Sequence, residues 1–117
     1  MASRYGLQIR TATPADAPGI AELFQNAGRP IEVAALAERL AALQQAPGTA
    51  LLALEWGPPS GLIALTWYPV LVDDHPVARI TTLLVGPEDR RRGVGRLLLK
   101  AASQAARAAH CTALTGC

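Results

Sequence analysis

The chain has 117 residues, half of them hydrophobic and 17% charged, with a formal net charge of +2 at pH 7. This length fits one domain with a real core, and the composition argues against disorder and against a broad nucleic-acid-binding surface. No stretch reaches the roughly 20 apolar residues of a membrane span, and the opening MASRYGLQIR has no apolar signal core. Two cysteines near one end, without paired histidines, define neither a disulfide framework nor a metal site. We therefore predict one domain, residues 1–117, in the cytoplasm.

The first part of the chain predicts a strand and two helices. Residues 7–12, LQIRTA, alternate in polarity as a half-buried strand does. Thr13 with Asp16 three positions later predicts a capping box, so a helix is expected from there to a stop at Gly28. A second helix is predicted over residues 31–46, before a Pro-Gly break.

The second part predicts mostly strands. Residues 49–57 and 62–72 are strands joined by a turn rich in Pro and Gly, which predicts a hairpin. Residues 77–85 are a long strand rich in β-branched side chains. A helix over residues 93–109 and a strand starting in residues 111–117 complete the order β-α-α-β-β-β-α-β. This order predicts an α/β or α+β domain with helices against a sheet.

Four arginines surround two glycines in PEDRRRGVGRLLLK, where the last helix begins: Arg90, Arg91, Arg92 and Arg96. A helix N-terminus carries about half a positive charge and therefore repels cations. Its free N–H groups and nearby glycines can instead hold an oxygen-rich anion, so we infer an anion site. The alternative is that Glu88 and Asp89 offset part of the charge and the arginines point into water. The nucleotide-binding patterns GxxxxGK[ST] and GxGxxG are not matched.

The longer segment ITTLLVGPEDRRRGVGRLLL resembles the coenzyme A-binding motif of the GNAT superfamily of N-acetyltransferases. The strand part of that motif is matched by Ile80, Leu83, Val85 and Pro87, and the loop pattern [Gln/Arg]-x-x-Gly-x-[Gly/Ala] by Arg90, Gly93 and Gly95. The order of elements and the opening IRTATPADAPGIAELF are also similar to the family. The resemblance therefore covers nearly the whole chain.

The resemblance implies a GNAT-like mixed, mostly antiparallel sheet flanked by helices, and acetyl-CoA as a cosubstrate without a metal. Backbone groups of Leu83, Leu84 and Val85 are expected to bind the pantetheine arm as an added strand would. Amides of the loop are expected to hold the pyrophosphate: Arg90, Arg91, Arg92, Gly93, Val94 and Gly95. Either Arg91 or Arg92 is expected to meet the 3′-phosphate.

No catalytic residue is assigned from the sequence. Acetylation requires a neutral amine, so a base usually removes a proton from the ammonium form. Family members often carry a glutamate where this chain has Thr81, whose hydroxyl is not a useful base near neutral pH. Other residues have side chains that could act as a base, although they do not occupy the family's glutamate position: Asp73, Asp74, His75 and Glu55. For the first three, an exposed turn is the alternative interpretation, and His110 fits a cation at a helix C-terminus.

The resemblance also implies the activity. We interpret the chain as an acetyl-CoA-dependent N-acetyltransferase that moves an acetyl group to a primary amine by direct attack. The acceptor is a small amine, an aminoglycoside-like antibiotic or a peptide N-terminus. The alternative is a non-catalytic CoA-binding or assembly module of the same fold. Nucleic-acid binding through Arg90–Arg92 is a remote third hypothesis, and no membrane partner is expected.

The end of the chain suggests an interface. Family members continue past the strand represented by CTALTGC into another helix and a hairpin, so the chain looks truncated after that strand. The outer edge of this strand would present unpaired backbone groups. We therefore predict a homodimer, or a higher homo-oligomer, joined near residues Cys111 to Cys117.

Overall fold

Five strands form one sheet whose spatial order follows the chain, β1-β2-β3-β4-β5. The computed structural model describes residues 7–90 and 92–116. The strands are β1 (Gln8–Thr11), β2 (Gly48–Leu54), β3 (Gly61–Tyr68), β4 (Val77–Val85) and β5 (Ala113–Thr115). Strands β1 to β4 pair antiparallel, and β5 pairs with β4 in parallel. This mixed, mostly antiparallel sheet confirms the predicted fold class and element order.

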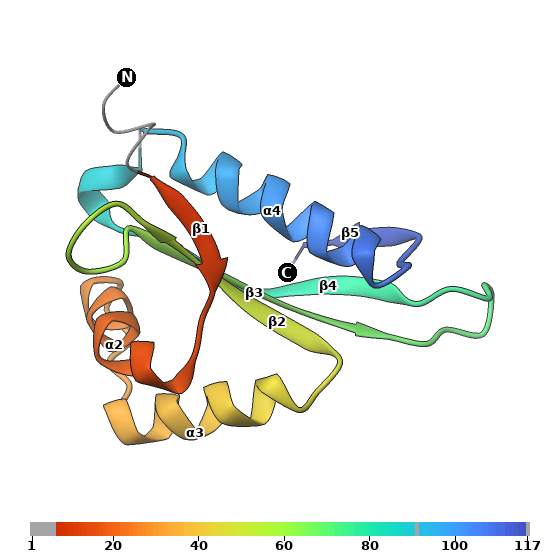
Figure 1. Ribbon diagram of the computed structural model, residues 1–117, viewed down its shortest axis with the longest axis horizontal. Coiled ribbons are helices and arrows are strands. Elements are labelled where there is room, and N and C mark those ends of the chain that lie inside the picture. Colours follow the sequence, from red (N-terminus) through yellow and green to blue (C-terminus); the bar gives the residue numbers. More distant parts are fainter. Residues whose placement is uncertain (1–6, 91, 117) are drawn as a thin grey trace.

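Helices cover both faces of the sheet (Figure 1). They are α2 (Ala17–Asn26), α3 (Val33–Gln44) and α4 (Val94–Ala108), with short 3-10 turns η1 (Pro14–Asp16) and η2 (Pro87–Asp89). One core cluster lies between the sheet and α4, and the other lies between the sheet and α2 with α3. Because both faces are buried, neighbouring residues of β2 such as Leu51 and Leu52 enter opposite clusters. This explains why β2 and β3 have continuous apolar sequences instead of alternating ones.

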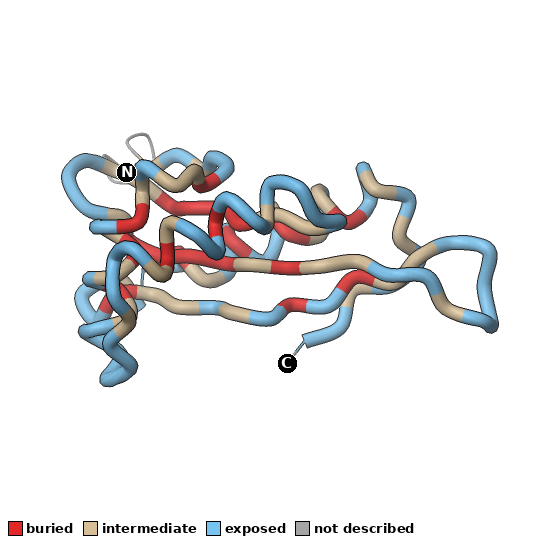
Figure 2. Tube along the Cα trace, turned by 90° about the horizontal axis from the view of Figure 1, so that it is seen from below, coloured by how far each residue is buried: buried red, intermediate tan, exposed pale blue. Residues whose placement is uncertain are grey.

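Several predicted boundaries are wrong, and the strand predicted over residues 49–57 ends at Leu54. The strand predicted through residue 72 ends at Tyr68, where Pro69 follows and offers no backbone N–H for the ladder. Beyond it, Leu71 and Val72 are fully exposed at the tip of the β3–β4 hairpin, which extends away from the core (Figure 2). The helix predicted to run on from Thr13 begins with the turn η1, and α2 follows at Ala17.

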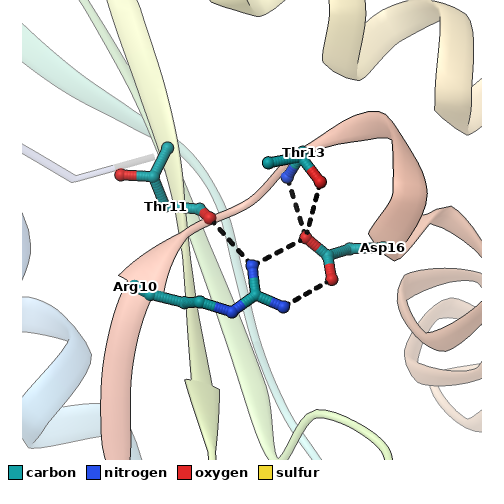
Figure 3. A network of polar contacts seen from close by, with 4 residues as sticks. All are labelled: Arg10, Thr11, Thr13 and Asp16. Carbon is teal, nitrogen blue, oxygen red and sulfur yellow. Dashed lines mark hydrogen bonds and ion pairs between the residues drawn. The ribbon is translucent and has the colours of Figure 1, made fainter.

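The start of this helical segment is fixed by a polar network (Figure 3). The backbone N–H of Thr13 donates to Asp16 Oδ2 at 2.8 Å, as the predicted capping box requires. The Arg10 guanidinium donates to both carboxylate oxygens of Asp16, at 2.9 and 2.7 Å. This bidentate pair, together with the Thr13 N–H, holds the pKa of Asp16 at about 2. The network therefore ties strand β1 to the first helical turn.

A β-bulge at Thr81 divides strand β4. Ala64 of β3 pairs with Thr82 and Leu65 pairs with Ile80, so Thr81 is an extra residue with no Cα partner. An inserted residue reverses the side-chain alternation that follows it. Accordingly, Ala78 and Ile80 enter the α4 cluster, whereas Leu84 packs on the α2 and α3 side. The bulge thus sets which face each residue of the motif strand contacts.

Candidate functional site

Beyond the bulge, one edge of β4 is open. Strand β5 pairs with β4 only at Val77–Arg79, so within the described residues no strand lies beside the later part of β4. The backbone N–H of Gly86 donates at 2.8 Å to the carbonyl oxygen of Ser60, the residue that precedes β3. By the alternation of an antiparallel ladder, the backbone groups of Leu83 and Val85 then face away from β3, toward the open edge. These groups are available to a ligand that binds as an added strand.

A small cavity of about 170 Å³ lies at this position. Strand and loop contribute Leu83, Leu84, Val85, Pro87 and Arg90, and the end of helix α2 with its C-cap contributes Leu23, Asn26 and Ala27. The structure therefore brings Arg90 together with the three motif-strand residues that the sequence predicted. It also adds the C-terminal turn of α2, which sequence reasoning missed, because nothing in the α2 sequence indicates its distance from β4.

The loop after β4 leads directly into helix α4, and the backbone N–H groups at the start of this helix are available to a ligand. Gly93 is the N-cap and has a φ of 79°, in the left-handed region that favours glycine. Helix α4 begins at Val94, and the N–H groups of its first turn have no intrahelical acceptors. A Cβ on Gly95 would lie 3.6 Å from Val85 Cγ2, an ordinary contact, so the first turn packs against the end of β4. This arrangement suits an anion near the open edge.

The loop arginines separate into different environments. Arg92 pairs with Glu55 at 2.5 Å and with Asp89 at 2.6 Å, which raises the pKa of its guanidinium above the ordinary value. Its backbone N–H donates to the Asp89 carbonyl at 3.1 Å. Arg92 is thus held by carboxylates, in agreement with the alternative that acidic residues offset part of the loop charge. Arg91 lies outside the described residues.

A cavity of about 520 Å³ adjoins this ion pair and differs in charge from the small one. Carboxylates line it: Glu22, Glu55, Glu88 and Asp89, with Arg92 as the one cation among the described lining residues. A polyanion would meet repulsion there. This side of the loop is therefore less suited to a polyanion than the side that carries Arg90.

A third cavity, of about 540 Å³, lies between the sheet and the α2–α3 layer. Its walls are mostly apolar side chains of the second core cluster, including Phe24, Leu36 and Leu62. Thr81 and Thr82 line it from β4, immediately before the residues that line the small cavity. The two cavities therefore follow one another along the motif strand. The charged lining residues are Arg29 and Arg39, which sequence reasoning missed, because their helices meet only in the tertiary structure.

The candidate bases lie elsewhere. His75 donates its backbone N–H to Asp73 Oδ1 at 3.0 Å, which forms the exposed turn that was the alternative interpretation. His75 precedes Thr81 by six positions, roughly 20 Å along a strand. Glu55 is paired with Arg92. Among the described residues, no aspartate, glutamate or histidine lines the 540 Å³ cavity. The described part of the chain also contains no cluster of three or more histidine, cysteine, aspartate or glutamate side chains that could hold a metal ion.

Thr81 itself is in the cavity wall. Its hydroxyl donates to the Ala64 carbonyl across the bulge at 3.3 Å. This bond gives the hydroxyl a structural partner at the position where a base was sought. The catalytic base, which the sequence left unassigned, therefore stays unassigned in the described part of the structure.

Comparison with known proteins identifies the class to which this mixed sheet, with its open edge beside a helix N-terminus, belongs. The model of the acetyltransferase (GNAT) family matches residues 18–117, and the chain belongs to this family. No curated protein matches the sequence. None of the described helices is long and apolar enough to cross a membrane.

Solved structures of this class resemble the chain over most of its length. A GNAT family acetyltransferase from Staphylococcus aureus subsp. aureus USA300_TCH1516 is 20% identical with a TM-score of 0.85, covering 95% of this chain and 85% of that chain. The ribosomal-protein-alanine N-acetyltransferase from Brucella melitensis biovar Abortus 2308 is 21% identical, with a TM-score of 0.77 and coverage of 95% and 79%. An aminoglycoside acetyltransferase from an uncultured soil metagenomic sample is 18% identical, with a TM-score of 0.79 and coverage of 97% and 78%. At these identities the likeness shows the fold.

Proposed function

We propose that the protein is an acetyl-CoA-dependent N-acetyltransferase that acetylates a primary amine by direct attack. The observation that carries this proposal is that two cavities lie one after the other along β4. Pantetheine would follow the open edge at Leu83 and Val85, with the pyrophosphate at the start of α4. The thioester would then lie where the small cavity meets the larger one, near Thr81. The acceptor amine would enter from the larger cavity.

The reaction follows from this arrangement. The neutral amine nitrogen attacks the thioester carbonyl carbon, a C–N bond forms and the C–S bond breaks. The proton that the nitrogen loses as it becomes an amide is taken up by the CoA thiolate, directly or through solvent, and CoA leaves as the thiol. Because no described carboxylate or imidazole lines the larger cavity, we propose that the amine loses its own proton to solvent and enters in the neutral form. The rate should then rise with pH until the pKa of the acceptor amine is reached.

Substitution of Gly95 tests the CoA site. A Cβ at Gly95 meets only Val85 at 3.6 Å, so Gly95→Ala should fold and keep CoA affinity. Gly95→Asp adds a negative charge next to the proposed pyrophosphate and should weaken CoA binding at least about tenfold, as expected for a lost charge-assisted contact. Calorimetry with CoA and with dephospho-CoA measures both variants. Equal affinity of Gly95→Asp and Gly95→Ala would exclude this loop as the anion site.

The lack of a base in the cavity wall, as far as the described residues go, also favours the second candidate, a non-catalytic CoA-binding module. Release of CoA thiol with a panel of primary amines separates the two candidates. An enzyme releases thiol with at least one amine, whereas a binding module holds CoA and releases none. A homodimer is compatible with both the enzyme and the binding module. The cytoplasmic location stays a prediction.

A further inference from the structure

We propose that the acceptor carries an anionic group, a carboxylate or a phosphate, that Arg29 and Arg39 bind while the amine faces Thr81. This inference rests on the proposed function, because it names the class of acceptor for that site. It starts from the charge of the 540 Å³ cavity, whose charged lining residues are both arginines. The remaining walls are apolar or carry a hydroxyl, so within the described residues nothing in the lining neutralises them.

Arg29 is placed by the end of helix α2. The N–H of Gly28 donates to the Gln25 carbonyl at 3.0 Å, and the N–H of Arg29 donates to the Phe24 carbonyl at 2.9 Å. These bonds form a Schellman motif, in which Gly28 takes the left-handed conformation with a φ of 77°. Pro30 then restricts the chain further. The backbone from which the Arg29 side chain extends is therefore fixed before any ligand binds.

Arg39 reaches the same cavity from helix α3. It lies three positions after Leu36 and four before Leu43, so the three side chains share one side of the helix. All three line the cavity. Two arginines from different segments thus converge on one apolar space, at the wall opposite β4.

These arginines differ from those with structural partners. Arg10 is paired with Asp16 and Arg92 with Glu55 and Asp89. Within the described part of the chain, neither Arg29 nor Arg39 forms an ion pair or a side-chain hydrogen bond. Guanidinium groups bind carboxylate and phosphate with two parallel hydrogen bonds, and Arg29 and Arg39 are both exposed at the rim of the cavity, where an anion can reach them. A polycationic amine would be repelled, so an aminoglycoside is the least compatible of the acceptors considered from the sequence.

Matched pairs of amines test the inference. The probes are phenylalanine against phenylalaninamide for a carboxylate, and O-phosphoethanolamine against ethanolamine for a phosphate. Each pair shares a body and differs in the anion. NMR titration of the full chain, with and without CoA, should show at least one anionic probe binding about tenfold tighter than its partner that lacks the anion. The pair with the larger ratio identifies the kind of anion.

Substitutions locate the effect. Arg29→Gln and Arg39→Gln should each weaken the anionic probe about fivefold, since both residues are exposed and solvent screens their charge, and should not weaken the partner that lacks the anion. Arg107→Gln removes the same charge from α4, on the opposite face, and should change neither. Raising the salt concentration should weaken only the anionic probe. Thermal unfolding checks that each variant is folded.

Several outcomes would overturn the inference. They are equal binding within both pairs, no binding of either anionic probe, tighter binding of a polycationic aminoglycoside, or an Arg107→Gln effect as large as the other two. Failure of the proposed function has a different signature, since the unmodified chain would then release no CoA thiol with any amine, even if it binds CoA. A preference for anionic probes without thiol release would support an anion site at Arg29 and Arg39 and would favour the binding module over the enzyme.

Discussion

At the scale of single residues, Asp16 shows how one carboxylate joins two elements. It accepts hydrogen bonds from Arg10 of β1 and from the backbone of Thr13, and its pKa falls from 3.8 to about 2. A carboxyl whose pKa is lowered by folding stabilises the protein above its unfolded pKa. This stabilisation is lost as the pH falls from about 4 to about 2.

We predict that Asp16→Asn lowers the free energy of unfolding at neutral pH by about 1 kcal/mol. The pKa change alone corresponds to about 2 kcal/mol, and we reduce it because Arg10 is half exposed and solvent screens the pair. Urea unfolding at a series of pH values measures the difference from the unmodified chain, which should vanish near pH 2. Asp74→Asn, in the exposed turn, is the control and should have little effect. A difference independent of pH would refute this assignment.

Thr81 carries a prediction about chemistry. Its hydroxyl donates to Ala64, and a hydroxyl is not a base near neutral pH. Thr81→Val should therefore keep turnover within about threefold, with the same rise of rate with pH, because the base is absent from both proteins. Steady-state kinetics over pH measures this. A loss above about 100-fold with CoA affinity intact, the scale of a lost general base, would show that Thr81 takes part in proton transfer.

At the scale of elements, the end of α2 controls where Arg29 lies. Gly28 has a φ of 77°, and a Cβ added there would meet no atom within 4 Å, so a side chain costs backbone strain and nothing else. We predict that Gly28→Ala destabilises the protein by about 1 kcal/mol. Gly95→Ala, in the first turn of α4, is the matched control and should be neutral or slightly stabilising. Chemical unfolding compares them, and equal effects would contradict the role of the left-handed cap.

At the scale of the whole molecule, β5 is an edge strand of three residues, Ala113–Thr115. It pairs with the first part of the motif strand, at Val77–Arg79 of β4, and not beside Leu83–Val85, where CoA is expected; Cys117 lies outside the described residues. The other edge of β5 pairs with no strand in the described chain. Such an edge can pair with a second copy, and a two-fold dimer closes the arrangement.

We therefore predict a homodimer, or a higher homo-oligomer, joined through residues 111–117. Sedimentation at several concentrations should show association of the full chain, and a chain ending at His110 should associate much more weakly. Thermal unfolding shows whether the shortened chain is folded. A full chain that is monomeric at high concentration, or a shortened chain that associates equally well, would rule out this strand as the interface.

The sequence by itself determined the order of elements, the Thr13–Asp16 cap and the position of the strand, loop and helix proposed to bind CoA. These features depend on residues close together in the chain, where hydrophobic period, capping side chains and glycine placement act directly. The overlong strand after Tyr68 is an instructive exception. Its apolar residues continued the pattern, but Pro69 ended the ladder and left Leu71 exposed.

Only the tertiary structure decided how the site is arranged. The bulge at Thr81 depends on the register of β4 against β3, and it reverses which face the following residues contact. Arg92, a candidate phosphate ligand, pairs with Glu55, 37 positions earlier in the chain. Arg29 and Arg39 meet at one cavity because two helices pack on the same face of the sheet. Such relationships join distant segments, and no local pattern encodes them.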